Sequence, residues 1–96
     1  MSELTFQWDP RKDAFNQRKH GVSFEEAKSV FSDESAKLIH DPDHSDDEER
    51  FILLGFRSAL RMLVVCHCHR DAESTIRIIS ARKATKSEAK NYPRKP

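Results

Sequence analysis

A chain of 96 residues, 36% of them hydrophobic and 34% charged, can form one domain with a small core, which we place at residues 1–96. Its formal net charge of +1 at pH 7 excludes neither a nucleic acid nor a protein as a partner. The sequence has no apolar run of membrane-spanning length and no signal-peptide pattern, so we expect a cytoplasmic protein with reduced thiols at Cys66 and Cys68.

The first expected elements are a short strand and a helix. Residues 4–8 alternate between apolar and polar side chains, as a half-buried strand does. An aspartate and a proline then fit the N-cap and the first position of a helix over residues 10–19, and Gly21 fits its C-terminal cap. We expect Ala14 and Phe15 to face the core.

A second helix is expected directly afterwards. Ser23 and Glu26 have the spacing of a capping box, in which each side chain binds the backbone N–H of the other residue. The apolar residues that follow have the spacing of one helical face: Phe24, Ala27, Val30 and Phe31. Both helices should therefore cover the same face of a sheet.

Four strands are expected in the rest of the chain, at residues 36–40, 50–56 and 60–69 and in the stretch 75–85, which ends in two cations and a helix start. Their short connections predict antiparallel pairing. A second capping box, Thr85 with Glu88, begins a C-terminal helix that should end near residue 91. The predicted class is α+β: a twisted antiparallel sheet, formed by a four-strand meander and the short N-terminal strand, with two N-terminal helices covering it and a C-terminal helix.

The last strand carries cations to the rim of the sheet. Arg77 lies inside an apolar run, where a charge is costly unless a ligand or an ion pair needs it, so it is our first candidate for binding phosphate. Arg82 and Lys83 come next, although either one can be a surface charge beside the helix. Arg77 and Arg82 are an odd number of residues apart and would point to opposite faces of a regular strand. They can share one site only if the strand bends or bulges near Ser80 and Ala81.

Three segments of the chain resemble the motifs of the BrnT family. The first, at residues 6–27, begins FQWDPRK and ends RKHGVSFEEA; the second, at 41–51, contains DPDHS and EERF; the third, at 77–84, is RIISARKA. Together they cover most of the chain in order. The resemblance implies a compact fold similar to that of the RelE toxins, with a twisted antiparallel sheet behind two helices.

The same resemblance implies a function and partners. BrnT proteins are ribonuclease toxins of bacterial type II toxin–antitoxin modules and inhibit translation. They are neutralised by a DNA-binding BrnA-like antitoxin, with two toxins around an antitoxin dimer, and the complex binds operator DNA only through the antitoxin. The alternative interpretation is a non-catalytic module whose basic sheet rim binds RNA or an acidic peptide, and cleavage of RNA distinguishes the two.

Cleavage of RNA without a metal ion needs a base, an acid, and cations that stabilise the phosphate. Arg77 and Arg82 are the candidate cations, because a guanidinium binds phosphate oxygens in pairs. The candidate catalytic groups for proton transfer are His40, at the end of a strand, and Glu49. A loop histidine without a role and an ion pair between Glu49 and Arg50 are the alternatives.

Five more residues are expected to bind RNA. His67 lies on the strand next to the last one and could reach the site across strands. Lys12 and Lys19, about two helical turns apart, could contact the RNA backbone, as could Lys83. Trp8 could stack on a base, although a lone tryptophan ahead of a helix is more often part of the core.

No metal ion or cofactor is expected. Residues 66–69 are Cys-His-Cys-His, but in a strand the cysteines face one way and the histidines the other, so the four cannot form a tetrahedral zinc site. Residues 40–44 are His-Asp-Pro-Asp-His and could hold a cation, but they lack the glycine turn and the distal glutamate of a calcium loop, so we expect an ordinary acidic loop.

Overall fold

The computed structural model describes residues 4–41, 49–57, 61–70 and 74–93. In these ranges the chain forms β1 (Thr5–Gln7), α1 (Pro10–His20), α2 (Phe24–Lys28), the 3-10 helix η1 (Ser29–Ser32), β2 (Lys37–Asp41), β3 (Arg50–Arg57), β4 (Arg61–Arg70), β5 (Thr75–Lys83) and α3 (Lys86–Ala89). Most of the expected acidic loop and of the two expected turns lies outside the described residues. None of the helices in those ranges is long and apolar enough to cross a membrane.

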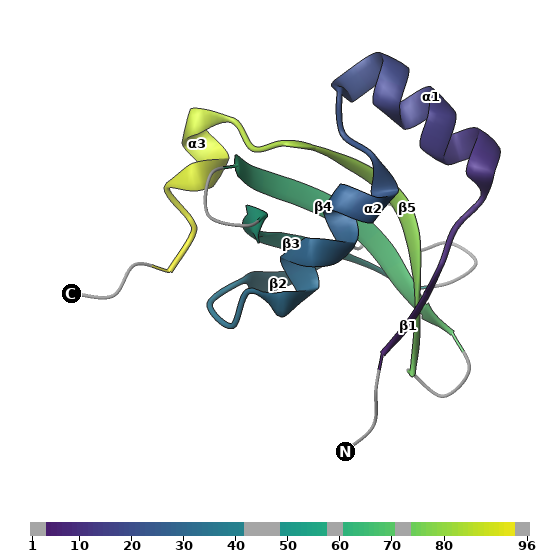
Figure 1. The fold of residues 1–96 in the computed structure, drawn as a ribbon. Helices are drawn as coiled ribbons and strands as arrows, with labels where there is room; N and C mark the ends of the chain where they lie inside the picture. Colours follow the sequence, from purple (N-terminus) through teal and green to yellow (C-terminus); the bar gives the residue numbers. More distant parts are fainter. Residues whose placement is uncertain (1–3, 42–48, 58–60, 71–73, 94–96) are drawn as a thin grey trace.

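The sheet has five strands in the order β1-β5-β4-β3-β2. Strands β2 to β5 form the expected antiparallel meander, and the predicted α+β class is confirmed. The N-terminal strand β1 lies at one edge and pairs with β5 in parallel, with Phe6 opposite Ile76. The helices carry the chain from this edge to β2 at the other edge (Figure 1).

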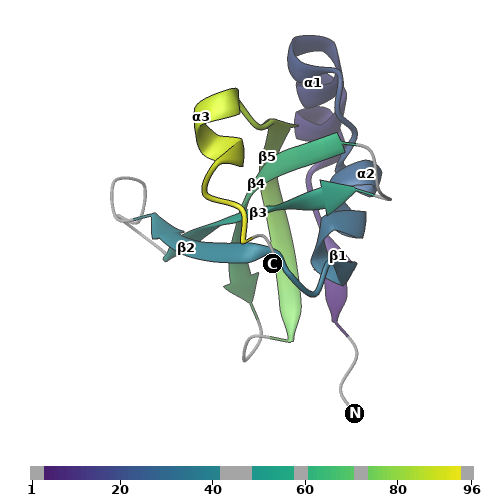
Figure 2. The same ribbon diagram turned by 90° about the vertical axis from the view of Figure 1, so that its left-hand side faces the viewer.

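The two faces of the sheet have different coverings. Figure 2 shows α1 and α2 on one side of the sheet and α3 on the other. We call the first side, which includes Leu53, Leu63 and Ile78, the helix face, because these side chains pack against α2 and η1 in the core. We call the other side, which includes Ile52 and Val64, the open face.

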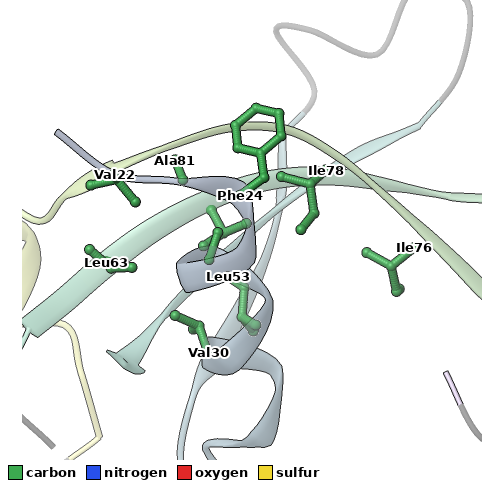
Figure 3. Close-up of a cluster of buried hydrophobic side chains, with 10 residues drawn as sticks. Val22, Phe24, Val30, Leu53, Leu63, Ile76, Ile78 and Ala81 are labelled. Carbon is green, nitrogen blue, oxygen red and sulfur yellow. The ribbon is translucent and has the colours of Figure 1, made fainter. Parts of the chain in front are cut away.

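The core lies between α2, η1 and the helix face (Figure 3). Ser23 caps α2 by accepting a hydrogen bond from the backbone N–H of Glu26, which is one half of the expected capping box, while the Glu26 carboxylate forms an ion pair with Arg61 at 3.3 Å. Gly21 has a φ of 70° at the end of α1, as expected. The buried cluster contains Val22, Phe24, Ala27, Val30, Leu53, Leu63, Val65, Ile76, Ile78 and Ala81. The apolar face predicted for the second helix is therefore the one that is buried, with Phe31 packed at its margin.

The inward side of α1 differs from the prediction. Ala14 and Phe15 are exposed, and 56% of the Phe15 surface is accessible. The buried residue of α1 is Asn16, which is 4% exposed. Its Nδ2 donates to the carbonyl oxygens of Val22 and Ala81, at 2.8 and 2.7 Å, and its Oδ1 accepts from the N–H of Ala81 at 3.1 Å. This amide pairs with the backbone of β5 beyond the end of β1, so α1 packs on the sheet through a polar contact.

The C-terminal helix α3 is shorter than expected. The capping box of Thr85 and Glu88 is present, but the helix ends at Ala89. The backbone then tightens into a turn, in which the N–H of Tyr92 donates to the carbonyl of Ala89. Tyr92 donates its hydroxyl to Asp33 at 2.8 Å, which fixes the turn against the chain that follows η1.

Candidate active site

A β-bulge in β5 places Arg77 and Arg82 on the same face. Cys66 of β4 is paired with Ser80, but the next residue, His67, is paired with Ile78, so Ile79 is an extra residue in β5. Because of this extra residue, the side chains of Arg77 and Arg82 no longer point to opposite faces of the strand, and both lie on the open face. The departure from a regular strand that the sequence required is therefore present, one residue earlier than expected.

The open face contains a pocket of about 230 Å³ next to the bulge. Its lining residues come from the four strands of the meander: Asp41, Arg50, Ile52, Val64, Cys66, Ile79, Ser80 and Arg82. Two guanidinium groups, a carboxylate and a hydroxyl thus surround an apolar floor. A pocket of this kind can bind an anion through the arginines and a flat apolar group through the floor.

Arg82 is held by Glu88. Its Nη1 and Nη2 donate to the two carboxylate oxygens of Glu88 at 2.8 and 2.7 Å, and Nη1 also donates to the carbonyl of Lys83 at 3.3 Å. The two side chains remain 40% and 34% exposed, respectively. Hydrogen bonds from Arg82 lower the pKa of Glu88 from 4.5 to about 2, so the pair is ionised at neutral pH.

Arg50 is a member of this site that sequence reasoning considered only as an ion-pair partner. It lies opposite Asp41 of β2 on one side and opposite Cys68 of β4 on the other, so all three share the open face. Strand alternation was the signal for it, because Arg50 and Ile52 are two residues apart on one face of the predicted strand. Burial raises the pKa of the neighbouring Cys66 thiol, which therefore stays protonated at neutral pH.

Arg77 lies on the open face outside this pocket. It is half-buried and sits between Cys68 of β4 and Gln7 of β1. Glu49 is exposed and directly precedes Arg50. Arg82 and Arg50 therefore line one pocket, and Arg77 lies on the same face, separated from Arg50 by Cys68 of β4. Glu49 directly precedes β3 and is not among the residues that line the pocket.

The histidines lie on the opposite face, and here the expected site must be corrected. The ring of His40 is 5.5 Å from that of Phe51, and the ring of His67 is 4.8 Å from that of Phe31 on η1. Both therefore belong to the helix face. His67 is 1% exposed and cannot contact RNA in this structure. His40 is exposed, but the sheet separates it from Arg82.

The buried His67 gives a prediction about acid stability. Burial lowers its pKa from 6.5 to about 4. Between these values the folded ring is neutral while the unfolded ring binds a proton, so the free energy of unfolding falls as the pH decreases from 6.5 to 4. The expected loss from this residue is about 3 kcal/mol, at 1.36 kcal/mol per pKa unit.

Urea unfolding between pH 7.5 and 4 measures this loss. His67→Leu should remove its part of the pH dependence, whereas His40→Gln, which changes an exposed histidine, should retain it. Parallel losses in the wild-type chain and His67→Leu would show that His67 binds its proton in the folded state.

The remaining predicted RNA-binding residues are scattered. Trp8 is partly buried and packs against the core, with its ring 6.1 Å from that of Phe24, which favours the core interpretation over stacking on a base. Lys12 and Lys19 are exposed on α1, away from the pocket. Lys83 is exposed and pairs with Leu63, which places it on the helix face.

The Cys-His-Cys-His run is divided between the two faces of β4. Cys66 lines the pocket of the open face, whereas the rings of His67 and His69 lie 5.6 Å apart on the helix face. Within the part of the chain that the structure describes, no three side chains of His, Cys, Asp or Glu are grouped as metal ligands would be.

Comparison with known proteins identifies the family. The family model of BrnT, the ribonuclease toxin of a type II toxin–antitoxin system, matches residues 8–88. The fold is similar to the 1.1 Å crystal structure of the Brucella abortus ribonuclease toxin BrnT, with a TM-score of 0.63, 25% identity, and coverage of 90% of this chain and 100% of that chain. No curated protein sequence matches significantly. The chain therefore belongs to the BrnT family of ribonuclease toxins of type II toxin–antitoxin systems.

Proposed function

We propose that this toxin acts in the cytoplasm, where it cleaves RNA without a metal ion and inhibits translation. As a toxin of a type II module it has an antitoxin as its partner. We further propose that this antitoxin is a DNA-binding, BrnA-like protein, that two toxins bind one antitoxin dimer, and that operator DNA is contacted only through the antitoxin. We also propose that the fold is similar to that of the RelE toxins. The observation that supports catalysis most is that Arg82 and Arg50 both line one pocket of the open face.

The proposed reaction is the attack of a ribose 2′-hydroxyl on the adjacent phosphorus. A base takes the proton of the 2′-hydroxyl, the new 2′-oxygen–phosphorus bond forms, and the bond to the 5′-oxygen breaks as an acid protonates that oxygen. The products are a 2′,3′-cyclic phosphate and a 5′-hydroxyl. Negative charge develops on the non-bridging oxygens, and Arg82, Arg50 and Arg77 would stabilise it in the place of a metal ion.

The positions of the predicted catalytic residues favour some proton-transfer roles over others. Glu49 is exposed and next to Arg50, so we propose it as a proton-transfer group. Asp41 lines the pocket and is an additional candidate. His40 lies across the sheet from Arg82, and we no longer assign it to this site. Lys12 and Lys19 remain proposed contacts for a longer RNA that extends past the edge of β5.

Cleavage of an RNA oligonucleotide by the purified chain in EDTA tests this proposal. Products ending in a cyclic phosphate are expected, and an oligonucleotide with 2′-O-methyl groups should remain intact, because it lacks the nucleophile. Cleavage of the methylated RNA, or cleavage only after Mg²⁺ is added, would contradict the mechanism.

A non-catalytic module that binds RNA is the second candidate, because Glu88 already occupies part of the Arg82 guanidinium. It predicts binding that weakens steeply with salt and no product at any enzyme concentration. Expression of the chain alone should arrest growth and incorporation of labelled amino acids, and co-expression of its antitoxin should restore both. Normal growth with soluble protein present would favour the binding module.

A further inference from the structure

The hydrogen bonds of Arg82 leave one edge of its guanidinium group available for a ligand. A guanidinium has five N–H groups in one plane. Three hydrogen bonds of Arg82 are found within the described residues: Nη1 and Nη2 donate to Glu88, and Nη1 donates to the carbonyl of Lys83. The two donors that remain are Nε–H and the second N–H of Nη2. They lie side by side on one edge of the guanidinium, at the spacing that binds two oxygens of a phosphate.

Glu88 is itself fixed from several directions. Its Oε1 accepts the backbone N–H of Thr85 at 2.9 Å, and its own backbone N–H donates to Thr85 Oγ1 at 3.1 Å. Beyond α3, Tyr92 packs its ring on Phe56 of the open face at 4.9 Å and donates to Asp33. The Glu88 carboxylate therefore has a fixed position, and it binds the Nη1 and Nη2 end of the Arg82 guanidinium, which lines the pocket.

We propose that Glu88 is a positioning residue for Arg82, which holds the guanidinium so that its Nε and Nη2 edge binds two non-bridging oxygens of an RNA phosphate. This inference rests on the proposed function of the pocket. Glu88 binds the Nη1 and Nη2 end of the guanidinium, whereas the phosphate would bind the Nε and Nη2 edge, so Glu88 does not compete with RNA for the same donors. The ion pair survives at every pH at which the protein would be assayed, because the pKa of Glu88 is about 2.

The sign of the effect on binding separates positioning from simple electrostatics. Removing an acid near an RNA site should strengthen RNA binding if only net charge matters. If Glu88 positions Arg82, its removal should weaken binding, because the guanidinium must then be ordered by the ligand itself. A Glu88 that merely blocked Arg82 would also give tighter binding and faster cleavage when removed.

The experiment uses the full chain and two readouts: fluorescence anisotropy with an uncleavable 2′-O-methyl RNA, and single-turnover cleavage of the matching RNA. Glu88→Ala is expected to weaken binding by about 10-fold and to slow cleavage by about 10- to 100-fold, the value of a charge-assisted hydrogen-bond pair. Glu88→Gln, which retains one acceptor, should recover part of the loss. Glu25→Gln, on α2, makes the same charge change away from the pocket and should leave both readouts unchanged.

Two further variants show that the effect passes through Arg82. In an Arg82→Ala background, Glu88→Ala should cause no additional loss. Thr85→Ala weakens the cap of α3 but leaves the carboxylate, so it should retain most of the binding if positioning, and not helix formation, is at stake. Tighter or unchanged binding by Glu88→Ala, or an equal loss in the Arg82→Ala background, would overturn the inference. A wild-type chain that binds but never cleaves would refute the proposed function, while the binding measurements would still test Glu88.

Discussion

Arg82→Ala is expected to slow RNA cleavage by about 100- to 1,000-fold, the usual cost of removing one group that stabilises charge in a transition state. The reason is geometric. The bulge at Ile79 turns Arg82 onto the open face, where it lines the same pocket as Arg50. Because the developing charge is larger than that of the ground state, we expect most of the loss in kcat, with a smaller change in KM.

Single-turnover cleavage at saturating enzyme measures this effect, and circular dichroism with thermal unfolding confirms that the variant is folded. Lys28→Ala removes the same charge from α2, on the other side of the sheet, and should cleave at the wild-type rate. Arg77→Ala should also be impaired, but less than Arg82→Ala, because Arg77 shares the face without lining the pocket. Full activity of Arg82→Ala and Arg77→Ala would mean that the phosphate site lies elsewhere.

Local chemistry was sufficient for most of the secondary structure. The N-cap at Asp9, the glycine at the end of α1 and the capping box at Thr85 are signals between residues close in sequence, and each forms as expected. The strands were recognisable because short apolar runs alternate with turn residues. The family motifs added the function, which neither composition nor periodicity could provide.

The composition of the site could be predicted only in part, because it depends on pairing between distant strands. Alternation showed that Arg77 and Arg82 required an irregular strand, but the extra residue at Ile79 is defined only by its partners on β4. The side of the sheet on which His40 lies follows from its pairing with Phe51, which is eleven residues further along the chain on the next strand, and no pattern within its own strand contains this information. Arg50, in contrast, could have been placed on one face with Ile52 by its spacing, and only its neighbours Asp41 and Cys68 depended on the folded sheet.

The inward face of α1 illustrates a second limit. Periodicity counts apolar residues, so it favoured Ala14 and Phe15, which are exposed. The residue that faces the sheet is the polar Asn16. At Ala81, beyond the end of β1, the backbone N–H and carbonyl of β5 have no partner strand on that side, and the Asn16 amide satisfies both. A polar side chain such as this one can be buried only if it forms hydrogen bonds. Its partner Ala81 is sixty-five residues away in the sequence, so the local pattern could not predict the burial.

Asn16→Asp is therefore expected to be among the most destabilising conservative changes in the chain. The aspartate loses the two N–H donors that bind the carbonyls of Val22 and Ala81, and it places an acceptor against both at a site that is 4% exposed. Two unsatisfied carbonyls and a poorly solvated carboxyl should lower the free energy of unfolding by about 3 to 5 kcal/mol. For a domain of this size the melting temperature should fall by more than about 10 °C.

Gln17→Glu is the matched control, because it makes the same chemical change at the next, exposed position of α1. It places a second acid one turn from Asp13 and removes the exposed hydrogen bond from Gln17 Nε2 to Asp13, which together should cost about 1 kcal/mol or less. Urea unfolding of the two variants at pH 7.5 compares them directly. Equal midpoints would show that the amide of Asn16 contributes little to stability. A large difference would establish that this amide supports the segment of β5 from which Arg82 projects, since Ala81 is both its partner and the residue before Arg82.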